Sequence, residues 1–513
     1  MYTAFFITSV SITTMAKKKA VKGEIVKRPP VVVIMGHIDH GKSTLLDYIR
    51  STNIVDGEAG GITQHLSAYV VNHKTKEGAE GKITFLDTPG HAAFQEMRLR
   101  GADVADIAIL IVSAEDGVKP QTLEALASIK AADIPFIVAI NKIDKSGADI
   151  PKTQSSLIEH EIYIEGMGGD IPWVGISAKS GEGIDDLLDL VVLAADLAEL
   201  EGDTGAPAEG TVIEGYKDVQ RGNTATLLIN NGTLRSGSFV VSGTAYAPVR
   251  IMEDFTGKTI KEATLSEPVG IVGFNEIPVA GATFSTVANK KEAEKYIETQ
   301  INNTKEEKFE RTNLPIVPIM IKADVLGTID AIKYELDKFE SDRIVVRVIE
   351  ASVGDITAAD VQNVSATENS IIVGFNVKAD RAATELAERL NVEIDTFSII
   401  YELAEWLETA LKNRTPRQED EVITGKAKIL VYFSTQKNTH VLGGRLDEGT
   451  LKLKQGVRII RRDIVVGKGK LTNLQHMKQD VDSISDGEFG MQIESKTTLA
   501  PGDYIEGFDL VVT

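Results

Sequence analysis

The sequence predicts a multidomain chain of mixed α/β and β class. Over residues 28–204, apolar strand patterns alternate with helical patterns, which is typical of a doubly wound parallel sheet. Residues 205–287 and 421–513 instead hold short alternating strands and glycine-containing turns, the pattern of a small antiparallel β-barrel. Between the barrels, residues 313–398 return to strand and helix alternation, so we expect a second, small α/β domain there.

Length and composition agree with this organisation. A chain of 513 residues is too long for one hydrophobic core and is expected to form about three to five domains. The absence of cysteine excludes disulfides and thiolate metal sites. The net charge of −20 argues against a protein that coats itself in nucleic acid, although a local basic surface could still contact RNA phosphates.

Residues 1–27 are expected to be a disordered leader. The first 14 residues are moderately apolar, but they lack a basic region and are too short and too rich in hydroxyls to span a bilayer. Met15 opens the basic stretch MAKKKAVKGEIVKRPP, which we interpret as the true start of translation. No other stretch resembles a membrane span, so we expect a cytoplasmic protein without membrane contact, and a monomer.

The first strand leads into a predicted phosphate-binding loop. The apolar run 31–35 is typical of a buried parallel strand, and it ends in a loop that closes on Gly41, Lys42 and Ser43 before a helix. Glycines let backbone N–H groups converge on a phosphate, Lys42 can reach the β- and γ-phosphates, and the Ser43 hydroxyl can ligate Mg²⁺. For this motif alone, a glycine-rich turn with a surface lysine remains the alternative. The expected phosphate contacts are Gly36, His37, Ile38, Asp39, His40, Gly41, Lys42, Ser43 and Thr44.

A carboxylate follows the strand KITFL in the motif Asp87-Thr88-Pro89-Gly90-His91, whose five residues are all expected to contact the nucleotide. At the carboxyl end of a parallel strand, Asp87 can hold Mg²⁺ through water, and Gly90 can donate its N–H to a γ-phosphate.

Two later motifs favour guanine as the base. The motif NKID ends the strand PFIVAI, and its aspartate can accept two hydrogen bonds from guanine, the second of which adenine cannot donate. The motif SAK, after the strand WVGI, adds a backbone N–H for the guanine O6. Either motif alone could be a polar turn. However, the phosphate loop, DTPGH, NKID and SAK follow predicted strands in this order. We therefore expect GTP contacts from Asn141, Lys142, Asp144, Ser177, Ala178 and Lys179.

Residues 51–70 are rich in glycine and lack periodicity, so we expect a mobile loop. The hydroxyl of Thr63 in this loop can ligate Mg²⁺ when GTP is bound, although a capping threonine is the alternative. We therefore expect Ser43 and Thr63 to ligate Mg²⁺ directly and Asp87 to do so through water.

The sequence also predicts a linker and two helices that connect the domains. Residues 201–210 have linker composition, and residues 288–312 and 399–420 are expected to form connecting helices, the second of them long and amphipathic. In the last barrel, eight cations fall within 27 residues whose only acid is Asp463. They form either an RNA-contacting face or an exposed meander with alternate lysines, and are Lys452, Lys454, Arg458, Arg461, Arg462, Lys468, Lys470 and Lys478.

The motifs GHIDHGKS, GGITQHL, DTPGHAAF, NKID and SAKSGEG, followed by barrel, α/β domain and barrel, resemble bacterial translation initiation factor 2. The resemblance begins at Arg28 and covers nearly all of the remaining chain. It implies a GTPase that positions initiator formylmethionyl-tRNA on the small ribosomal subunit, promotes subunit joining and hydrolyses GTP on the assembled ribosome. It also implies that His91 orients the attacking water, which Ile38 and Ile62 keep away until the ribosome rearranges the site, whereas His91 alone would suggest only a helix-start histidine.

The sequence departs from that family in three places. It has no counterpart of the large N-terminal extension common there, and it has Ser43 where threonine is usual, which keeps the hydroxyl. In the last barrel, two cysteines and a Lys-Arg-aromatic stretch of the family are replaced. The residues at or beside these positions, which we expect to contact initiator tRNA, are Gly444, Gln475, His476, Lys478, Glu488 and Phe489.

Two other function classes remain open. One is an elongation-factor-like GTPase that delivers a special aminoacyl-tRNA, although residues 314–397 argue against it because elongation factors place a second barrel directly after the first. The other is a nonribosomal GTPase switch whose last barrel binds protein.

Overall fold

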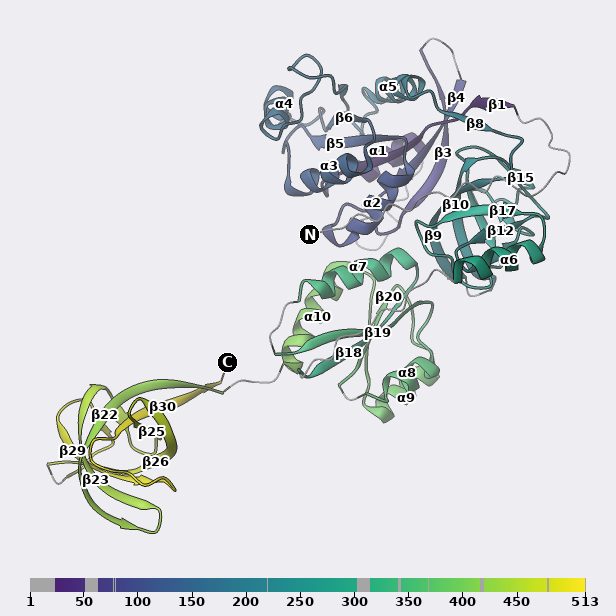
Figure 1. Cartoon of the computed structure of the whole chain (residues 1–513). Helices are drawn as coiled ribbons and strands as arrows, with labels where there is room; N and C mark the ends of the chain where they lie inside the picture. The colour runs from purple at the N-terminus through teal and green to yellow at the C-terminus, as the bar shows by residue number, and fades with distance from the viewer. Residues whose placement is uncertain are drawn as a thin grey trace. The chain divides into compact units, whose positions relative to one another are not determined.

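The computed structural model describes residues 24–50, 63–76, 78, 80–218, 220–301, 314–339, 343–367, 369–415, 419–477 and 479–512. The chain forms two compact units, Met1–Arg414 and Thr415–Thr513 (Figure 1). Met15 and most of the expected leader lie outside the described residues. The expectation of disorder up to residue 27 is nevertheless wrong at its end. Strand β1 (Ile25–Lys27) pairs with β8 (Glu201–Asp203), because the chain entering the first domain meets the chain leaving it, so the linker at 201–210 is also partly strand.

The first domain is built on a six-stranded sheet of order β3-β4-β2-β5-β6-β7, parallel except for the antiparallel pair β3 and β4. The strands are β2 (Val31–Gly36), β3 (Ser67–Lys74), β4 (Glu80–Asp87), β5 (Ile107–Ser113), β6 (Phe136–Asn141) and β7 (Trp173–Gly175). The expectation of a loop as far as residue 70 is wrong from Ser67, where pairing with β4 begins, whereas residues 51–62 lie outside the described part.

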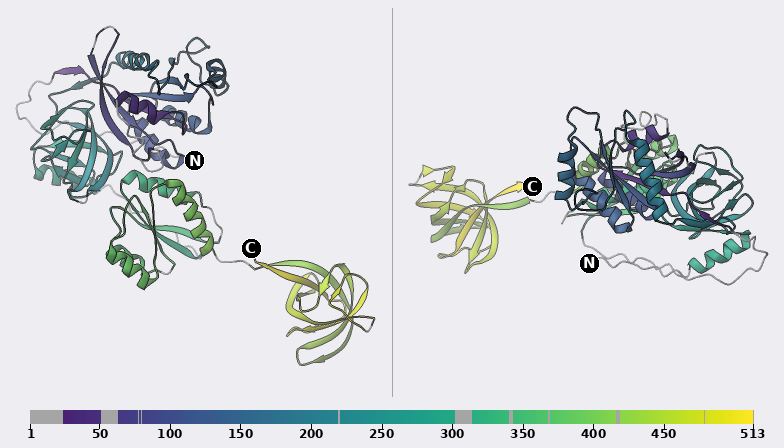
Figure 2. Two further views of the ribbon diagram at one scale, coloured as in Figure 1. Left: turned by 180° about the vertical axis from the view of Figure 1, so that it is seen from behind. Right: turned by 90° about the horizontal axis from the view of Figure 1, so that it is seen from above.

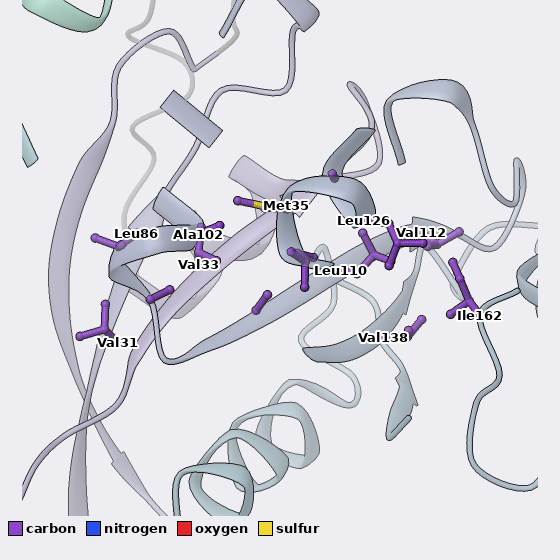
Figure 3. Close-up of a cluster of buried hydrophobic side chains, with 14 of the residues drawn as sticks. Val31, Val33, Met35, Leu86, Ala102, Leu110, Val112, Leu126, Val138 and Ile162 are labelled. Atoms are coloured by element: carbon purple, nitrogen blue, oxygen red, sulfur yellow. The ribbon is translucent and has the colours of Figure 1, made fainter. Parts of the chain in front are cut away.

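Helices cover both faces of this sheet, which explains why β2 and β5 are buried along their whole length. Side chains alternate between the faces. Val31, Val33 and Met35 pack in one cluster (Figure 3), whereas Val32 and Ile34 pack in the other. The helices are α1 (Lys42–Arg50), η3 (Ala92–Phe94), α2 (Gln95–Val104), α3 (Pro120–Ala132), α4 (Ile150–Glu159) and α5 (Ile184–Leu197).

The second domain is an antiparallel barrel-like sheet of order β13-β12-β17-β9-β10-β16-β14, beside a small pair of β11 and β15. Arg28 of the first domain pairs with Asp106 and reaches Ser266 of this domain at 3.1 Å. The strands are β9 (Glu209–Asp218), β10 (Gly222–Asn231), β11 (Leu234–Arg235), β12 (Phe239–Ser242), β13 (Ala245–Pro248), β14 (Met252–Glu253), β15 (Glu262–Ala263), β16 (Pro268–Val272) and β17 (Thr283–Val287), followed by helix α6 (Lys290–Ile301).

The third domain has a four-stranded parallel sheet of order β19-β18-β20-β21. Helices α7 and α10 lie on one face and α8 and α9 on the other (Figures 1 and 2). The elements are β18 (Ile316–Ala323), α7 (Leu326–Asp337), β19 (Val345–Val353), α8 (Ala358–Val364), β20 (Ile371–Phe375), α9 (Arg381–Leu390), β21 (Glu393–Phe397) and α10 (Ile400–Arg414).

Helix α10 corrects the expectation of a connecting helix over 399–420. It ends at Arg414, and its apolar stripe, including Leu403, Leu407 and Leu411, is buried in the core of the third domain. An amphipathic helix buries its stripe when a sheet face is available, and the sequence alone does not show which face that is. Of the first connecting helix, expected over 288–312, the structure describes α6 as far as Ile301, and residues 302–313 lie outside the described part.

The three domains meet at Glu214, a buried residue of β9. Its Oε1 accepts hydrogen bonds from the backbone N–H groups of Gly215 at 3.0 Å and of Gly327, at the start of α7, at 3.3 Å. Arg100 of α2 pairs with Asp330 of α7 at 3.1 Å beside it. Burial raises the pKa of Glu214 to about 7, and the Arg100 guanidinium and the two backbone N–H groups partly oppose this shift.

The second unit is a closed barrel. Its sheet order is β25-β30-β22-β23-β29-β26-β27, and pairing of β25 with β26 closes it. In the described part of the chain, no helix has both the length and the apolar character needed to cross a bilayer. The strands are β22 (Glu419–Gln436), β23 (Thr439–Gly449), β24 (Leu451–Lys452), β25 (Gly456–Arg461), β26 (Ile464–His476), β27 (Gln479–Asp480), β28 (Ser483–Ile484), β29 (Glu488–Glu494) and β30 (Tyr504–Val512).

Candidate nucleotide-binding site

A cavity of about 220 Å³ opens where β2, β4 and β6 end. These strands are parallel, so their carboxyl ends lie along one edge of the sheet. The residues that line the cavity come from four of the predicted motifs, which are far apart in sequence. They are Ile38, Asp39, Gly41, Lys42, Ser43, Thr44, Thr63, Gly90, His91 and Lys142.

Lys42 extends over the phosphate loop. Its Nζ donates to the carbonyl oxygens of Gly36 at 3.0 Å and His37 at 2.8 Å. Burial lowers the pKa of Lys42 to about 8, and the Asp87 carboxylate partly opposes this shift. A cation that is held by carbonyls and poorly solvated has a strong electrostatic preference for an anionic ligand.

At two positions of this loop, neighbouring atoms leave no room for the Cβ of any residue other than glycine. A Cβ on Gly36, whose φ is +150°, would lie 2.5 Å from the Ile111 carbonyl oxygen. A Cβ on Gly41, whose φ is +91°, would lie 2.3 Å from the Asn141 side chain. The loop therefore packs directly against β5 and against the predicted base-binding motif.

The three predicted magnesium ligands converge. The hydroxyl oxygens of Ser43 and Thr63 are 3.0 Å apart, and the Thr63 hydroxyl lies 3.4 Å from Asp87 Oδ2. Hydroxyl and carboxylate oxygens are the hard ligands that Mg²⁺ prefers, so this donor set fits the ion. Within the described residues, no group of three His, Cys, Asp or Glu side chains has metal-binding geometry.

His91 caps helix η3, and this contact defines its chemistry. The ring Nδ1 accepts a hydrogen bond from the Ala93 N–H at 3.0 Å, so the hydrogen-bond network assigns the proton of the neutral ring to Nε2. Burial lowers the pKa of His91, which favours the neutral form at pH 7. In this arrangement Nε2–H can donate to a water molecule, but neither nitrogen is available as a general base.

Arg98 of α2 and Gln121 of α3 support the site, and the sequence analysis missed both. Arg98 is 2% exposed, donates to the carbonyls of Pro89 and His91, and pairs with Glu124 at 3.0 Å. The Gln121 side chain accepts from the Ile38 N–H at 3.0 Å. No local pattern distinguishes them from surface residues of a helix.

The two histidines of the phosphate loop have structural contacts. His40 is buried, its Nδ1 accepts from the Ser113 N–H at 3.3 Å, and burial lowers its pKa to about 4. The His37 ring lies edge-on to it, with 4.9 Å between centroids. Neither ring lines the cavity, so a contact with phosphate would come from their backbone N–H groups.

The predicted base-binding motifs are joined by Asn141. Its amide nitrogen donates to the His40 carbonyl at 2.8 Å, and its amide oxygen accepts from the Ala178 N–H at 3.0 Å. Ser177 donates to Asp144 Oδ1 at 2.8 Å, which orients that exposed carboxylate. Of their neighbours in sequence, Lys142 lines the cavity and Lys179 is exposed. Thr88, of the motif after β4, is buried with its hydroxyl donating to the Ile34 carbonyl. Ile62 lies outside the described residues.

We expect Asp144→Asn to weaken GTP binding and to permit binding of xanthosine triphosphate. The amide can donate to the 2-oxo group of xanthine, whereas the carboxylate of the wild type only accepts from guanine. Titration with GTP and with xanthosine triphosphate measures this change in base specificity. Asp149→Asn is the control, because Asp149 caps α4 and is not expected to contact the base. Unchanged GTP affinity in Asp144→Asn would contradict the assignment of this motif.

The residues predicted to contact tRNA are not gathered in one pocket. Gly444 faces Phe489 across β23 and β29, but Phe489 is 4% exposed in the barrel core, where the absence of a side chain at Gly444 leaves room for Met491. Gln475 lines a cavity of about 130 Å³ together with Phe433 and Met491. Neither His476 nor Glu488 lines this cavity, and Lys478 lies outside the described residues.

Four of the seven described cations in the basic stretch of the last barrel pair with acids. Glu421 on β22 holds both Arg458 and Lys468. Asp503 pairs with Arg461 at 2.8 Å, and Asp509 pairs with Lys452 at 3.0 Å. These acids are distant in sequence, so the sequence analysis overestimated the free positive charge.

Comparisons with known proteins fit this geometry. Residues 27–196 match the family "Elongation factor Tu GTP binding domain", residues 207–287 match "Elongation factor G domain 2", and residues 288–408 match "Translation-initiation factor 2". The chain is 41% identical over 506 residues to translation initiation factor IF-2 of Rhizobium etli, a match that covers 95% of this chain and 55% of that protein. It is 39% identical over 502 residues to translation initiation factor IF-2 of Clostridium perfringens, with 95% and 73% covered.

The chain thus spans about half the length of the Rhizobium relative. A solved structure, "GDP-bound aIF5B from Aeropyrum pernix", is 26% identical, covers 94% of this chain and 92% of that one, and aligns with a TM-score of 0.48.

Proposed function

Because the chain belongs to the translation initiation factor IF-2 family, we propose that it hydrolyses GTP while it places initiator formylmethionyl-tRNA on the small ribosomal subunit and promotes subunit joining. It acts as a monomer in the cytoplasm, and the assembled ribosome stimulates hydrolysis. The observation that carries the proposal is the convergence of Ser43, Thr63 and Asp87 beside Lys42 and His91.

Catalysis at this site consists of positioning and charge stabilisation. Lys42 and the N–H groups of residues 36–44 hold the β- and γ-phosphates. The side chains of Ser43 and Thr63, with Asp87 acting through water, would hold Mg²⁺, which supplies positive charge opposite the phosphate oxygens.

His91 orients the attacking water. Its Nε2–H donates to one lone pair of the water oxygen and leaves the other lone pair free to attack the γ-phosphate. The proton of the water passes to the phosphate oxygens rather than to His91, because Nδ1 is already used by Ala93. Ile38 and Ile62 exclude water until the ribosome changes their positions.

The last barrel binds the aminoacyl end of initiator tRNA. The cavity beside Phe433 and Met491 is apolar enough for a methionyl side chain, and Gln475 offers an amide to the formyl group. Gly444 and Phe489 pack in the barrel core with Met491 of this cavity, and His476, Lys478 and Glu488 would contact other parts of the tRNA.

Cosedimentation with small ribosomal subunits and initiator tRNA tests this function. We expect the full chain to retain initiator tRNA on these subunits with a nonhydrolysable GTP analogue and much less with GDP. A chain ending at Arg414, which keeps the first compact unit, should still hydrolyse GTP but should no longer protect the aminoacyl ester of initiator tRNA.

The other function classes predict different results. Retention of one special aminoacyl-tRNA in place of initiator tRNA would favour the elongation-factor-like GTPase. A lack of any ribosome association would contradict the proposal and favour a GTPase switch outside translation.

A further inference from the structure

An aromatic contact joins the nucleotide site to the third domain. The rings of His91 and Tyr401 meet edge to face, with 4.3 Å between centroids and 87° between planes. His91 lines the nucleotide cavity, whereas Tyr401 lies in the first turn of α10. Tyr401 is also near the phosphate loop, because the Asp39 carboxylate contributes, after burial, to raising the pKa of its hydroxyl.

Further contacts hold this part of the third domain against the site. Helix η3 and the start of α2 pack into the core of the third domain, where Phe94 and Met97 share one cluster with Leu403 of α10. Close to Thr63, Gln64 donates to the Ser398 carbonyl at 3.0 Å, and His65 lies 3.4 Å from the Asp324 carboxylate. These contacts hold the backbone segments that carry His91 and Tyr401 next to each other, and the Tyr401 side chain, which is 43% exposed, covers the His91 ring from the solvent side.

We propose that Tyr401 is a positioning residue for GTP hydrolysis, through which the third domain sets the orientation of the His91 ring. The Ala93 hydrogen bond fixes one edge of the ring, and the Tyr401 ring restricts its rotation, so that Nε2–H points in a defined direction. This inference deepens the proposed function and rests on it, since it assumes that His91 acts on the attacking water.

Single-turnover GTP hydrolysis on assembled ribosomes tests the proposal with three variants. We expect Tyr401→Ala to lower the rate about tenfold at unchanged GTP affinity, which is the size of effect that one edge-to-face pair provides. Tyr401→Phe retains the ring and should hydrolyse GTP like the wild type. Glu402→Ala, at the exposed neighbouring position of the same turn, controls for damage to α10.

Measuring the effect of Tyr401→Ala in the His91→Ala variant distinguishes a positioning role of Tyr401 from a general structural role. In His91→Ala, the further change Tyr401→Ala should have no additional effect, because no ring is left to orient. An equal loss in both backgrounds, an unchanged rate or a faster rate would overturn the proposal.

The titration of His91, followed by nuclear magnetic resonance of its ring protons, provides a readout independent of hydrolysis. Arg98, Glu335 and Lys338 also influence the pKa of His91, but Tyr401→Ala leaves all three in place. Removing Tyr401 should expose the ring and raise its pKa toward the ordinary histidine value, and an unchanged pKa would contradict the contact. If the wild type fails to hydrolyse GTP on ribosomes, the proposed function fails, whereas this titration still tests the pairing.

Discussion

Replacing Lys42 by alanine is expected to weaken GTP binding by about a thousandfold, because removal of one partner from a buried charge pair costs roughly 3–5 kcal/mol and about 1.4 kcal/mol corresponds to a factor of ten. The nucleotide-free variant should still fold. The pKa of Lys42 in the folded protein, about 8, lies below its unfolded value of 10.5, so the unfolded chain binds this proton more tightly. Charged Lys42 therefore disfavours the folded state at pH 7, and its removal should not lower the melting temperature.

Calorimetric titration with GTP and thermal unfolding at pH 7 measure the two effects of Lys42→Ala. Lys145→Ala is the matched control, since Lys145 is an exposed lysine of the same domain. Nearly normal GTP affinity in Lys42→Ala would contradict the assignment of the phosphate loop. A large fall in melting temperature would instead show that the contacts of Lys42 with the two loop carbonyls outweigh its burial.

His91→Ala is expected to lose ribosome-stimulated hydrolysis by about a hundredfold or more, with GTP affinity within about twofold of the wild type. A residue that orients water acts mainly in the transition state, so its removal lowers kcat without weakening ground-state binding. Alanine also removes the cap of η3, and for this reason His91→Asn is the sharper variant. Asparagine can accept the Ala93 N–H but has no ring, and it should lose as much activity as alanine.

The control for these variants is His160→Ala. His160 is the C-terminal cap of α4, where its Nδ1 lies 2.8 Å from the Ser156 carbonyl, and it does not line the cavity. Hydrolysis by His91→Asn at the wild-type rate would show that capping, rather than chemistry, explains the presence of a histidine at this position.

The convergence of the motif residues could be predicted from the sequence because each motif stands at the end of a strand. Parallel strands end at one edge of a sheet, so the positions of Lys42, Asp87 and Asn141 in the chain already imply that they meet. Both barrels and the third domain could also be predicted, since strand periodicity and glycine turns are local signals.

What could not be predicted depends on contacts between distant segments. Arg98 is a buried arginine on a helix, and only the fold shows that it holds the loop carrying His91. The pairing of β1 with β8 and the burial of α10 likewise need a partner surface that local patterns do not specify. Phe489 was assigned to a binding pocket by its alignment with a family motif, but strand alternation directs it into the core.

The acids that face the basic stretch of the last barrel determine how strongly salt would affect its binding of RNA. A cation that already pairs with a carboxylate displaces no ion from the atmosphere around RNA, and each free cation contributes a slope of about 0.7 in log affinity against log salt concentration. Of the seven cations of this stretch that the structure describes, four are paired in this way, namely Lys452, Arg458, Arg461 and Lys468. If this barrel contacts RNA, the expected slope is therefore smaller by about 3 than the sequence suggests, so added salt should weaken the contact less steeply.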